Sequence, residues 1–168
     1  MSTLAFEAMV FARTAHALQV RKYTGNHYSD HLAEVAGIVA TIDSSPESIA
    51  VAWLHDCRED QGVTGAEIED RFGIRVAVGV ALLSDFETGN RADRKAASCA
   101  RLASAPGWVQ TIKCADLISN TSSIVMHEPK FAITYLAEKR ALLDAMVLAH
   151  PRLREMAYSQ AKEQPNDR

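Results

Sequence analysis

Apolar residues recur at intervals of three or four along most of the chain. The segment 4–19 places Phe6, Met9 and Val10 along one side, and the segment 31–41 carries a similar apolar stripe. This interval matches the period of an amphipathic helix rather than the alternation of a strand. The first quarter of the chain is therefore predicted to form two helices, each with one face toward a core.

A third helix is predicted to be central. Ser45 suits an N-cap, Pro46 suits the first helical position, and Glu47 places an acid in the first turn. The residues that follow, 49–54, are apolar on nearly every side. A helix without a polar face is buried among other helices, so we predict one buried helix from Glu47 to Asp60.

The remaining chain continues the helical pattern. Thr64 with Glu67 three residues later forms the signature of a capping box. Further helices are predicted over 75–83, 90–104, 108–125, 131–149 and from Pro151 onward. The β-branched residues of 75–83 leave a strand possible there. We predict an all-α protein, a bundle of about seven to nine helices, with one domain over residues 1–162 and a polar tail at 163–168.

Composition narrows the function classes. The chain has 168 residues, 18 basic and 21 acidic, for a net charge of −3. Because basic and acidic residues are nearly equal in number, a nucleic-acid polymer is not the expected partner. The longest apolar runs are far shorter than a membrane span, and residues 1–10 lack the basic start of a secretory signal. Three widely spaced cysteines indicate reduced thiols, so we expect a cytoplasmic protein without a membrane partner.

One short segment concentrates unusual chemistry. Residues 55–60 read His-Asp-Cys-Arg-Glu-Asp. Three acids in the last turn of the predicted helix oppose its macrodipole, at about 0.3–1 kcal/mol each, and a compensating cation is expected. The alternative is a solvated helix end with an incidental histidine. Cys57 within this segment is interpreted as a packing thiol, because no matched histidine supports a nucleophile.

Two distant residues extend this segment to a candidate metal site. His31 opens the second predicted helix, and Asp116 is the lone acid of the apolar stretch 112–118. A buried acid needs a partner. With His55 and Asp56, these residues form a mixed nitrogen and oxygen donor set that suits Mn²⁺, Fe²⁺ or Zn²⁺.

These residues and their order resemble those of the HD-domain phosphohydrolases. Within that superfamily the chain is most similar to the (p)ppGpp hydrolase domain of RelA/SpoT-type proteins and to the small alarmone hydrolases. The similarity is carried by segments 15–22, 25–31, 52–60, 63–68 with 72–73, 94–95, and 112–116 with Asn120. It covers roughly residues 5–145. One departure is Gln61, which replaces the usual Thr after the acid pair.

The resemblance implies a reaction and a role for each matched residue. The expected activity is removal of the 3′-pyrophosphate of (p)ppGpp, an alarmone of the stringent response, to give GDP or GTP. One Mn²⁺, or another divalent ion, would be held by His31, His55, Asp56 and Asp116. Glu59 and Asp60 would orient or deprotonate the attacking water. The expected substrate contacts are Arg21, Lys22, Tyr28, Arg94, Lys95, Lys113 and Asn120.

Other interpretations stay open at the level of sequence. The same metal site could act on another nucleotide, such as the 2′-phosphate of NADPH, or the chain could bind a small anionic nucleotide without turnover. With no room for a synthetase domain, we expect degradation only, and the oligomeric state is left open. His16 is interpreted as a packing or supporting residue, and Lys139 with Arg140 as a solvated helix face.

Overall fold

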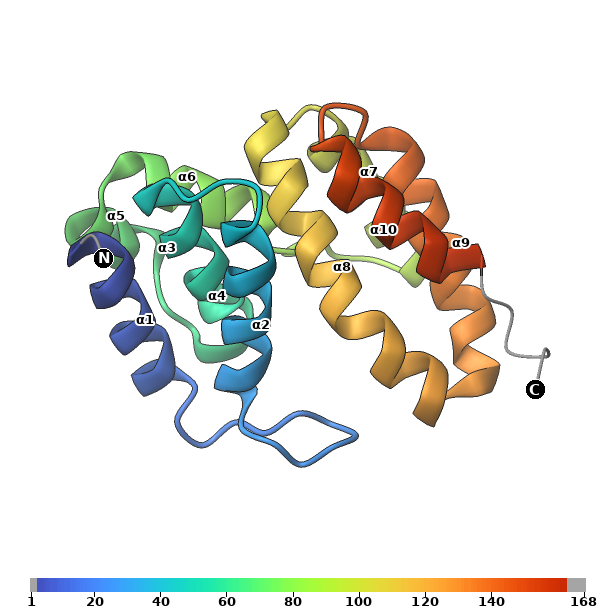
Figure 1. Ribbon diagram of the computed structural model, residues 1–168, viewed down its shortest axis with the longest axis horizontal. Helices are drawn as coiled ribbons and strands as arrows, with labels where there is room; N and C mark the ends of the chain where they lie inside the picture. The colour runs from blue at the N-terminus through green and yellow to red at the C-terminus, as the bar shows by residue number, and fades with distance from the viewer. Residues whose placement is uncertain (1–2, 163–168) are drawn as a thin grey trace. The chain divides into compact units, whose positions relative to one another are not determined.

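The protein is helical throughout the part that its computed structural model describes, residues 3–162 (Figure 1). Within that range there are ten helices, nine of them with eight or more residues, and no strand. A single antiparallel bridge joins Val20 to His27. The predicted all-α fold is confirmed, and the segment in which a strand was possible is the helix α6, Ile74–Leu83.

The chain divides into two compact units, with the boundary between Phe86 and Glu87. The single domain predicted for 1–162 stays a prediction, and the predicted tail at 163–168 lies outside the described residues. None of the helices within 3–162 is long and apolar enough to cross a bilayer.

The first unit is organised around α3. Its helices are α1 (Thr3–Ala15), α2 (Tyr28–Ala40), α3 (Pro46–Leu54), α4 (Cys57–Gln61), α5 (Gly65–Phe72) and α6. Helix α3 packs against α1, α2 and α6, while α5 packs against α6. Residues 50–52 and Leu54 are fully buried and Trp53 nearly so. The apolar segment is therefore central, as its pattern predicted.

The predicted helix 47–60 is two helices, which corrects the prediction. Helix α3 ends at Leu54, and α4 begins at Cys57. The His55 Nδ1 atom lies 2.8 Å from the Ala52 carbonyl oxygen, the acceptor that a continuing helix would use for the N–H of Asp56. Glu59 and the acid after it thus stand in the first turn of α4, where the helix dipole does not oppose them.

The predicted helix starts differ in how they are capped. Ser45 occupies the N-cap of α3, but its hydroxyl makes no capping hydrogen bond. Instead, the carboxylate of Asp43 accepts from the Ser45 N–H at 2.9 Å and from the Ser48 hydroxyl at 2.6 Å. The Thr64 hydroxyl accepts from the N–H of Glu67 at 3.1 Å, which confirms the predicted start of α5.

The second unit contains four helices built around α8. They are α7 (Arg91–Ala103), α8 (Gly107–His127), α9 (Pro129–Ala145) and α10 (Pro151–Lys162). Helix α8 packs against α9 and α10, and α9 also packs against α7. The long apolar helix of this unit is thus covered by its neighbours, as a helix with few polar faces must be.

Lys139 on α9 is buried, so its interpretation as part of a solvated face was wrong. Its side chain is only 2% exposed. The ammonium donates to the Thr121 hydroxyl at 2.6 Å, the Gln160 side-chain oxygen at 2.9 Å and the Leu117 carbonyl at 3.5 Å. Its neighbour Arg140 donates to the Ala161 carbonyl at 2.6 Å. The helical period of α9 could not show that Lys139 is buried, because α10 is one of the helices that bury it.

This buried lysine predicts a stability that depends on pH. Burial lowers the pKa of Lys139 to about 8, whereas an unfolded lysine has a pKa of about 10.4. Between these values the unfolded chain binds more protons, so the free energy of unfolding rises with pH. Lys139→Met is expected to remove a rise on the order of 3 kcal/mol between pH 8 and 10.5.

Urea unfolding of the parent, Lys139→Met and Lys130→Met at both pH values measures this effect. The exposed Lys130 serves as the matched control. Parallel slopes for the parent and Lys139→Met would contradict the prediction.

Candidate metal centre

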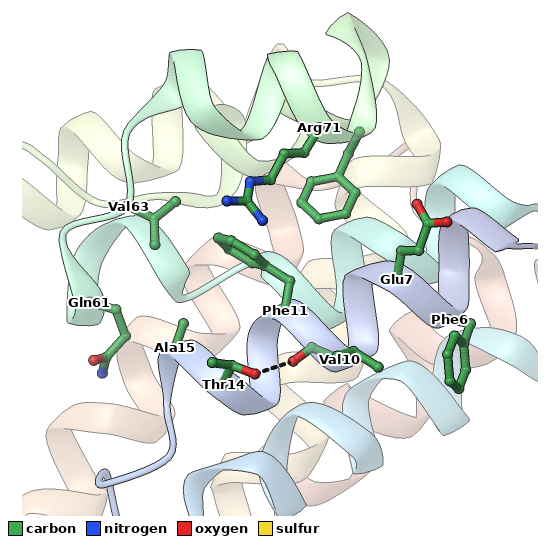
Figure 2. Close-up of a pocket in the computed structure, with 10 residues that line it drawn as sticks. Phe6, Glu7, Val10, Phe11, Thr14, Ala15, Gln61, Val63 and Arg71 are labelled. Carbon is green, nitrogen blue, oxygen red and sulfur yellow. Dashed lines mark hydrogen bonds between the residues drawn. The ribbon is translucent and has the colours of Figure 1, made fainter.

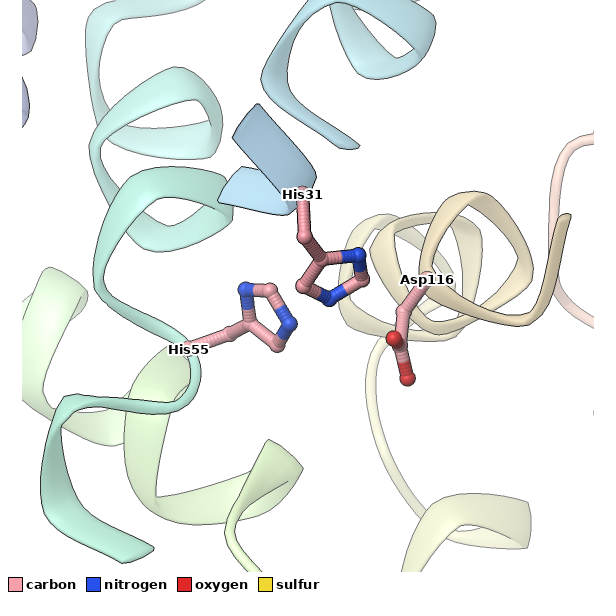
Figure 3. A group of neighbouring side chains, drawn as sticks. All are labelled: His31, His55 and Asp116. Carbon is pink, nitrogen blue, oxygen red and sulfur yellow. The ribbon is translucent and has the colours of Figure 1, made fainter. Parts of the chain in front are cut away.

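Two buried imidazoles lie together in the first unit. His31 stands in the first turn of α2, and His55 follows the last residue of α3. Their rings meet edge to face with centroids 5.3 Å apart (Figure 3). The residues are 1% and 3% exposed, respectively. Two histidines distant in sequence thus lie together in one buried place, which a solvated helix end with an incidental histidine does not explain.

Asp56 adds a carboxylate to the imidazole pair. Its Oδ2 atom lies 3.0 Å from His55 Nε2 and 3.6 Å from His31 Nε2. The same oxygen accepts a hydrogen bond of 2.6 Å from the Tyr28 hydroxyl. Two nitrogens and one carboxylate oxygen therefore converge within the first unit alone.

The protonation of His55 tests whether this group fits a cation. The Ala52 carbonyl can only accept, so His55 must donate from Nδ1. In a neutral ring Nε2 then carries a lone pair, and it faces the Asp56 oxygen. Ligand atoms about 2.1 Å from one ion and at right angles are about 3.0 Å apart. The backbone contact is also the usual support for a metal-bound histidine, so these residues suit a divalent ion.

Tyr28 positions this carboxylate, a role that the sequence did not reveal. Tyr28→Phe removes the donor to Asp56 while keeping the ring that stacks on His16 at 5.0 Å. We expect metal affinity to fall about 10- to 100-fold, as for other residues that support a ligand. Titration calorimetry with Mn²⁺ measures this, and Tyr23→Phe on the adjacent loop is the control. Equal affinity of parent and Tyr28→Phe would contradict the prediction.

The predicted acid pair lies on α4, directly after this group. Glu59 accepts from the N–H of Asp85 at 2.5 Å, and Asp60 accepts from the side-chain amide of Gln19 at 2.8 Å. Both acids are exposed. Each carboxylate is therefore held by at least one hydrogen bond and is exposed to water.

The loop between α1 and α2 carries the first predicted substrate contacts. The Arg21 guanidinium lies 3.4 Å from a carboxylate oxygen of Glu34. The Lys22 ammonium donates to the Tyr23 hydroxyl at 3.1 Å and lies 4.7 Å from that ring's centroid. Arg21 is partly buried and Lys22 is exposed. Their roles toward a substrate stay predictions.

In the second unit, three predicted residues share one face of α8. The carboxylate of Asp116 is buried and accepts from the Lys113 ammonium at 2.8 Å and the Asn120 amide at 2.7 Å. Asp116 is also drawn in Figure 3. Lys113 and Asn120 thus orient this acid, besides the substrate roles predicted for them. Arg94 and Lys95 are exposed near the start of α7.

Sequence reasoning missed a polar network that reaches Asp60. Gln19 donates to that carboxylate, and its own carbonyl oxygen lies 2.5 Å from both His16 Nδ1 and Gln61 Nε2. His16 is 1% exposed and stacks on Tyr28, which bears out its interpretation as a packing or supporting residue. The signal available in the sequence was Gln61 at the place where Thr was expected.

Gln61 also lines an apolar pocket of about 680 Å³ on the first unit (Figure 2). Rings of Phe6, Phe11 and Phe72 form much of its wall, and Arg71 lies beside them. Its lining includes none of the predicted metal ligands. The pocket therefore borders the Asp60 network rather than the imidazole pair.

The environment of Cys57 disfavours nucleophilic chemistry at its thiol. Burial, together with the nearby Asp56 and Asp60 carboxylates, raises the pKa of its thiol to about 12. A thiol of that pKa is protonated near neutrality and is a poor nucleophile. The interpretation of Cys57 as a packing residue fits this environment.

Comparison with known proteins identifies a family model and several relatives that this chain resembles. The protein-family model described as HD domain matches residues 8–106. Guanosine-3′,5′-bis(diphosphate) 3′-pyrophosphohydrolase of Aquifex aeolicus (strain VF5) is 44% identical over 70 residues, 42% of this chain and 10% of that protein. A probable enzyme of the same name from Synechocystis sp. (strain ATCC 27184 / PCC 6803 / Kazusa) is 31% identical over 129 residues, 73% of this chain and 17% of that protein.

The chain thus spans between 10% and 17% of the length of these two curated relatives. Among solved structures, a metazoan ortholog of SpoT, described as hydrolysing ppGpp and playing a role in starvation responses, superposes with a TM-score of 0.88. The two share 20% identity over 95% of this chain and 94% of the other. This likeness shows the fold.

Proposed function

We propose, on the premise that this chain belongs to the HD-domain family, that it is a metal-dependent hydrolase of the alarmones ppGpp and pppGpp. The reaction would remove the 3′-pyrophosphate, leaving GDP or GTP. The observation that carries the proposal is the group of His31, His55 and Asp56 followed at once by Glu59 and Asp60. Two relatives of this region are named as 3′-pyrophosphohydrolases of guanosine-3′,5′-bis(diphosphate).

The proposed metal ligands are His31, His55, Asp56 and Asp116, and the proposed ion is Mn²⁺. In support, the first three converge within one unit, and the fourth is a buried carboxylate oriented by two donors. When bound, a divalent ion supplies Lewis-acid polarisation of a phosphoryl oxygen and acidifies water at the site. Mixed imidazole and carboxylate donors suit Mn²⁺ among other ions.

The acid pair would handle the proton of the attacking water. Glu59 or Asp60, both exposed and each accepting a hydrogen bond from the protein, would accept it, as a carboxylate within hydrogen-bond reach of water can. The oxygen of that water would bond to phosphorus as the bond from phosphorus to the ribose 3′ oxygen breaks. The 3′ oxygen would take up a proton, from the carboxylic acid just formed or from solvent, to give the 3′-hydroxyl of GDP or GTP, and pyrophosphate would leave.

Cationic and polar side chains would bind the nucleotide. Arg21 and Lys22 are proposed to contact the guanine base, with Tyr28 beside them. Arg94 and Lys95 are exposed and suit phosphate oxygens. Lys113 and Asn120 already contact Asp116; Lys113 would support the site, and Asn120 would contact the ribose. A small anionic nucleotide is therefore the proposed partner.

The three free cysteines suit a reducing compartment. We propose that the protein works in the cytoplasm.

A substrate panel tests the proposed activity. Purified protein with Mn²⁺ is incubated with ppGpp, GTP or NADPH, and pyrophosphate and orthophosphate are measured separately. We expect pyrophosphate and GDP from ppGpp, and no release after treatment with EDTA. Orthophosphate from NADPH alone would identify a different nucleotide hydrolase. Binding of ppGpp without release of any product would identify a non-catalytic module.

A further inference from the structure

We propose that Gln61 is a positioning residue: with His16, it holds the Gln19 amide in the one orientation that presents N–H to Asp60. The inference rests on the proposed function, because Asp60 belongs to the proposed acid pair. It concerns a residue that departs from the pattern of the resembled family, so the family's own site does not imply it.

Four side chains from two segments make the network: two lie just after α1 and two at the end of α4. Gln19, in the loop after α1, donates from Nε2 to Asp60 Oδ2 at 2.8 Å. Gln61, at the end of α4, donates from Nε2 to Gln19 Oε1 at 2.5 Å. His16 Nδ1 lies 2.5 Å from that same oxygen. The Gln19 amide thus faces an acceptor with its nitrogen and two nitrogens with its oxygen.

With Gln61 in the orientation that the structure gives, hydrogen-bond chemistry favours one orientation of the Gln19 amide. A carboxylate can only accept and an amide NH₂ group can only donate. Turning Gln19 by half a rotation would place its oxygen against Asp60 and its nitrogen against the Gln61 nitrogen. Both contacts would then join groups of the same kind, so the two partners together exclude the turned state.

His16 supports the same orientation through its tautomer. Its Nδ1 atom is 3.3 Å from Gln61 Nε2 but closer to the Gln19 oxygen, so it donates to that oxygen. The other ring nitrogen, Nε2, is buried and has no hydrogen-bond partner among the described residues. Stacking on Tyr28, with ring centroids 5.0 Å apart and planes at 17°, fixes the ring itself.

The consequence for chemistry concerns which oxygen of Asp60 meets water. Gln19 occupies Oδ2, which leaves Oδ1 for the attacking water. If the amide turned, its oxygen would repel Oδ2 and the carboxylate would rotate away. A threonine, usual at position 61 in the resembled family, is shorter and has a single donor. Gln61 therefore performs a task for which the shorter threonine is less suited.

Steady-state kinetics on ppGpp with Mn²⁺ tests the proposal. Gln61→Met keeps length and loses the donor, and Gln61→Glu replaces the donor with an acceptor. We expect kcat to fall about tenfold for the first and further for the second, with KM and Mn²⁺ affinity within about twofold of the parent. Thr14→Val, in the wall of the same pocket (Figure 2) but outside the network, is the matched control.

A double-mutant cycle and a spectroscopic readout separate positioning from simple destabilisation. Gln19→Met with Gln61→Met should be no slower than Gln19→Met alone, because both act through one contact. The side-chain amide signals of Gln19, assigned in ¹⁵N spectra by their loss in Gln19→Met, should shift and broaden in Gln61→Met. Unfolding midpoints identify any variant that fails to fold.

Unchanged kcat and unchanged Gln19 signals in Gln61→Met would overturn the proposal, as would additive losses in the cycle. If the parent released no pyrophosphate, the proposed function would fail. The Gln19 signals would then still decide whether Gln61 orients that amide, so the two failures are distinguishable.

Discussion

Asp56→Asn is expected to lower the affinity for Mn²⁺ by at least about 100-fold and to abolish measurable release of pyrophosphate. The substitution keeps the shape of the side chain and removes its charge. Its Oδ2 atom faces His55 Nε2 at 3.0 Å and accepts from Tyr28. With an amide there, the two imidazoles lose the anionic donor that would complete their ligand set.

Titration calorimetry with Mn²⁺ and the pyrophosphate assay measure the two effects of Asp56→Asn separately. Asp43→Asn is the matched control. Asp43 is also a partly buried acid of the first unit: burial raises its pKa, but hydrogen bonds from Ser48 and Ser45 together with nearby Arg75 leave that pKa lowered overall. This control should cost stability and leave metal affinity unchanged. Full Mn²⁺ affinity in Asp56→Asn would refute the proposed metal centre.

Glu59→Gln is expected to reduce kcat by about 10²- to 10⁴-fold, the usual contribution of a general base. Metal affinity should remain within about twofold of the parent, because Glu59 is not a proposed ligand. The amide oxygen can still accept from the Asp85 N–H, as the carboxylate does at 2.5 Å. The fold of the loop should therefore persist, and the loss should belong to the chemical step.

Single-turnover rates on ppGpp, with Mn²⁺ saturating, measure the effect of Glu59→Gln. Glu67→Gln on α5 is the control, since that acid pairs with Arg71 at 3.5 Å and belongs to no proposed site. Retention of more than half the parent rate in Glu59→Gln would assign the proton transfer elsewhere, with Asp60 as the next residue to test.

Local sequence pattern accounts for the helices because the relevant forces act within a few residues. The apolar residues of 49–54 predicted a buried helix, and residues 50–54 are indeed buried in α3. The pattern did not predict the break at His55, where a side chain takes the carbonyl of Ala52. It also could not show that Lys139 is covered by α10, since cover comes from a segment about twenty residues away.

The residues of the candidate site were likewise predicted in part from the sequence and in part only from the structure. The residue types and their order predicted that His31, His55 and Asp56 belong to one site. These residues come together because α2 packs against α3. Tyr28 is predicted to contact substrate, and only the structure showed that its hydroxyl also donates to Asp56. Gln19 was not predicted to belong to the site, because the sequence does not show which partners an amide side chain in a loop will contact.

The amino-acid sequence by itself determined the helical class, the buried middle helix and the set of chemically capable side chains, because these follow from side-chain type and periodicity. Only the tertiary structure decided which nitrogen of His55 faces the carboxylate, which oxygen of Asp60 is occupied and which lysine is buried. Those outcomes depend on distances between segments that are far apart in the chain. Packing sets these distances, and they decide which groups form hydrogen bonds and which lose contact with water.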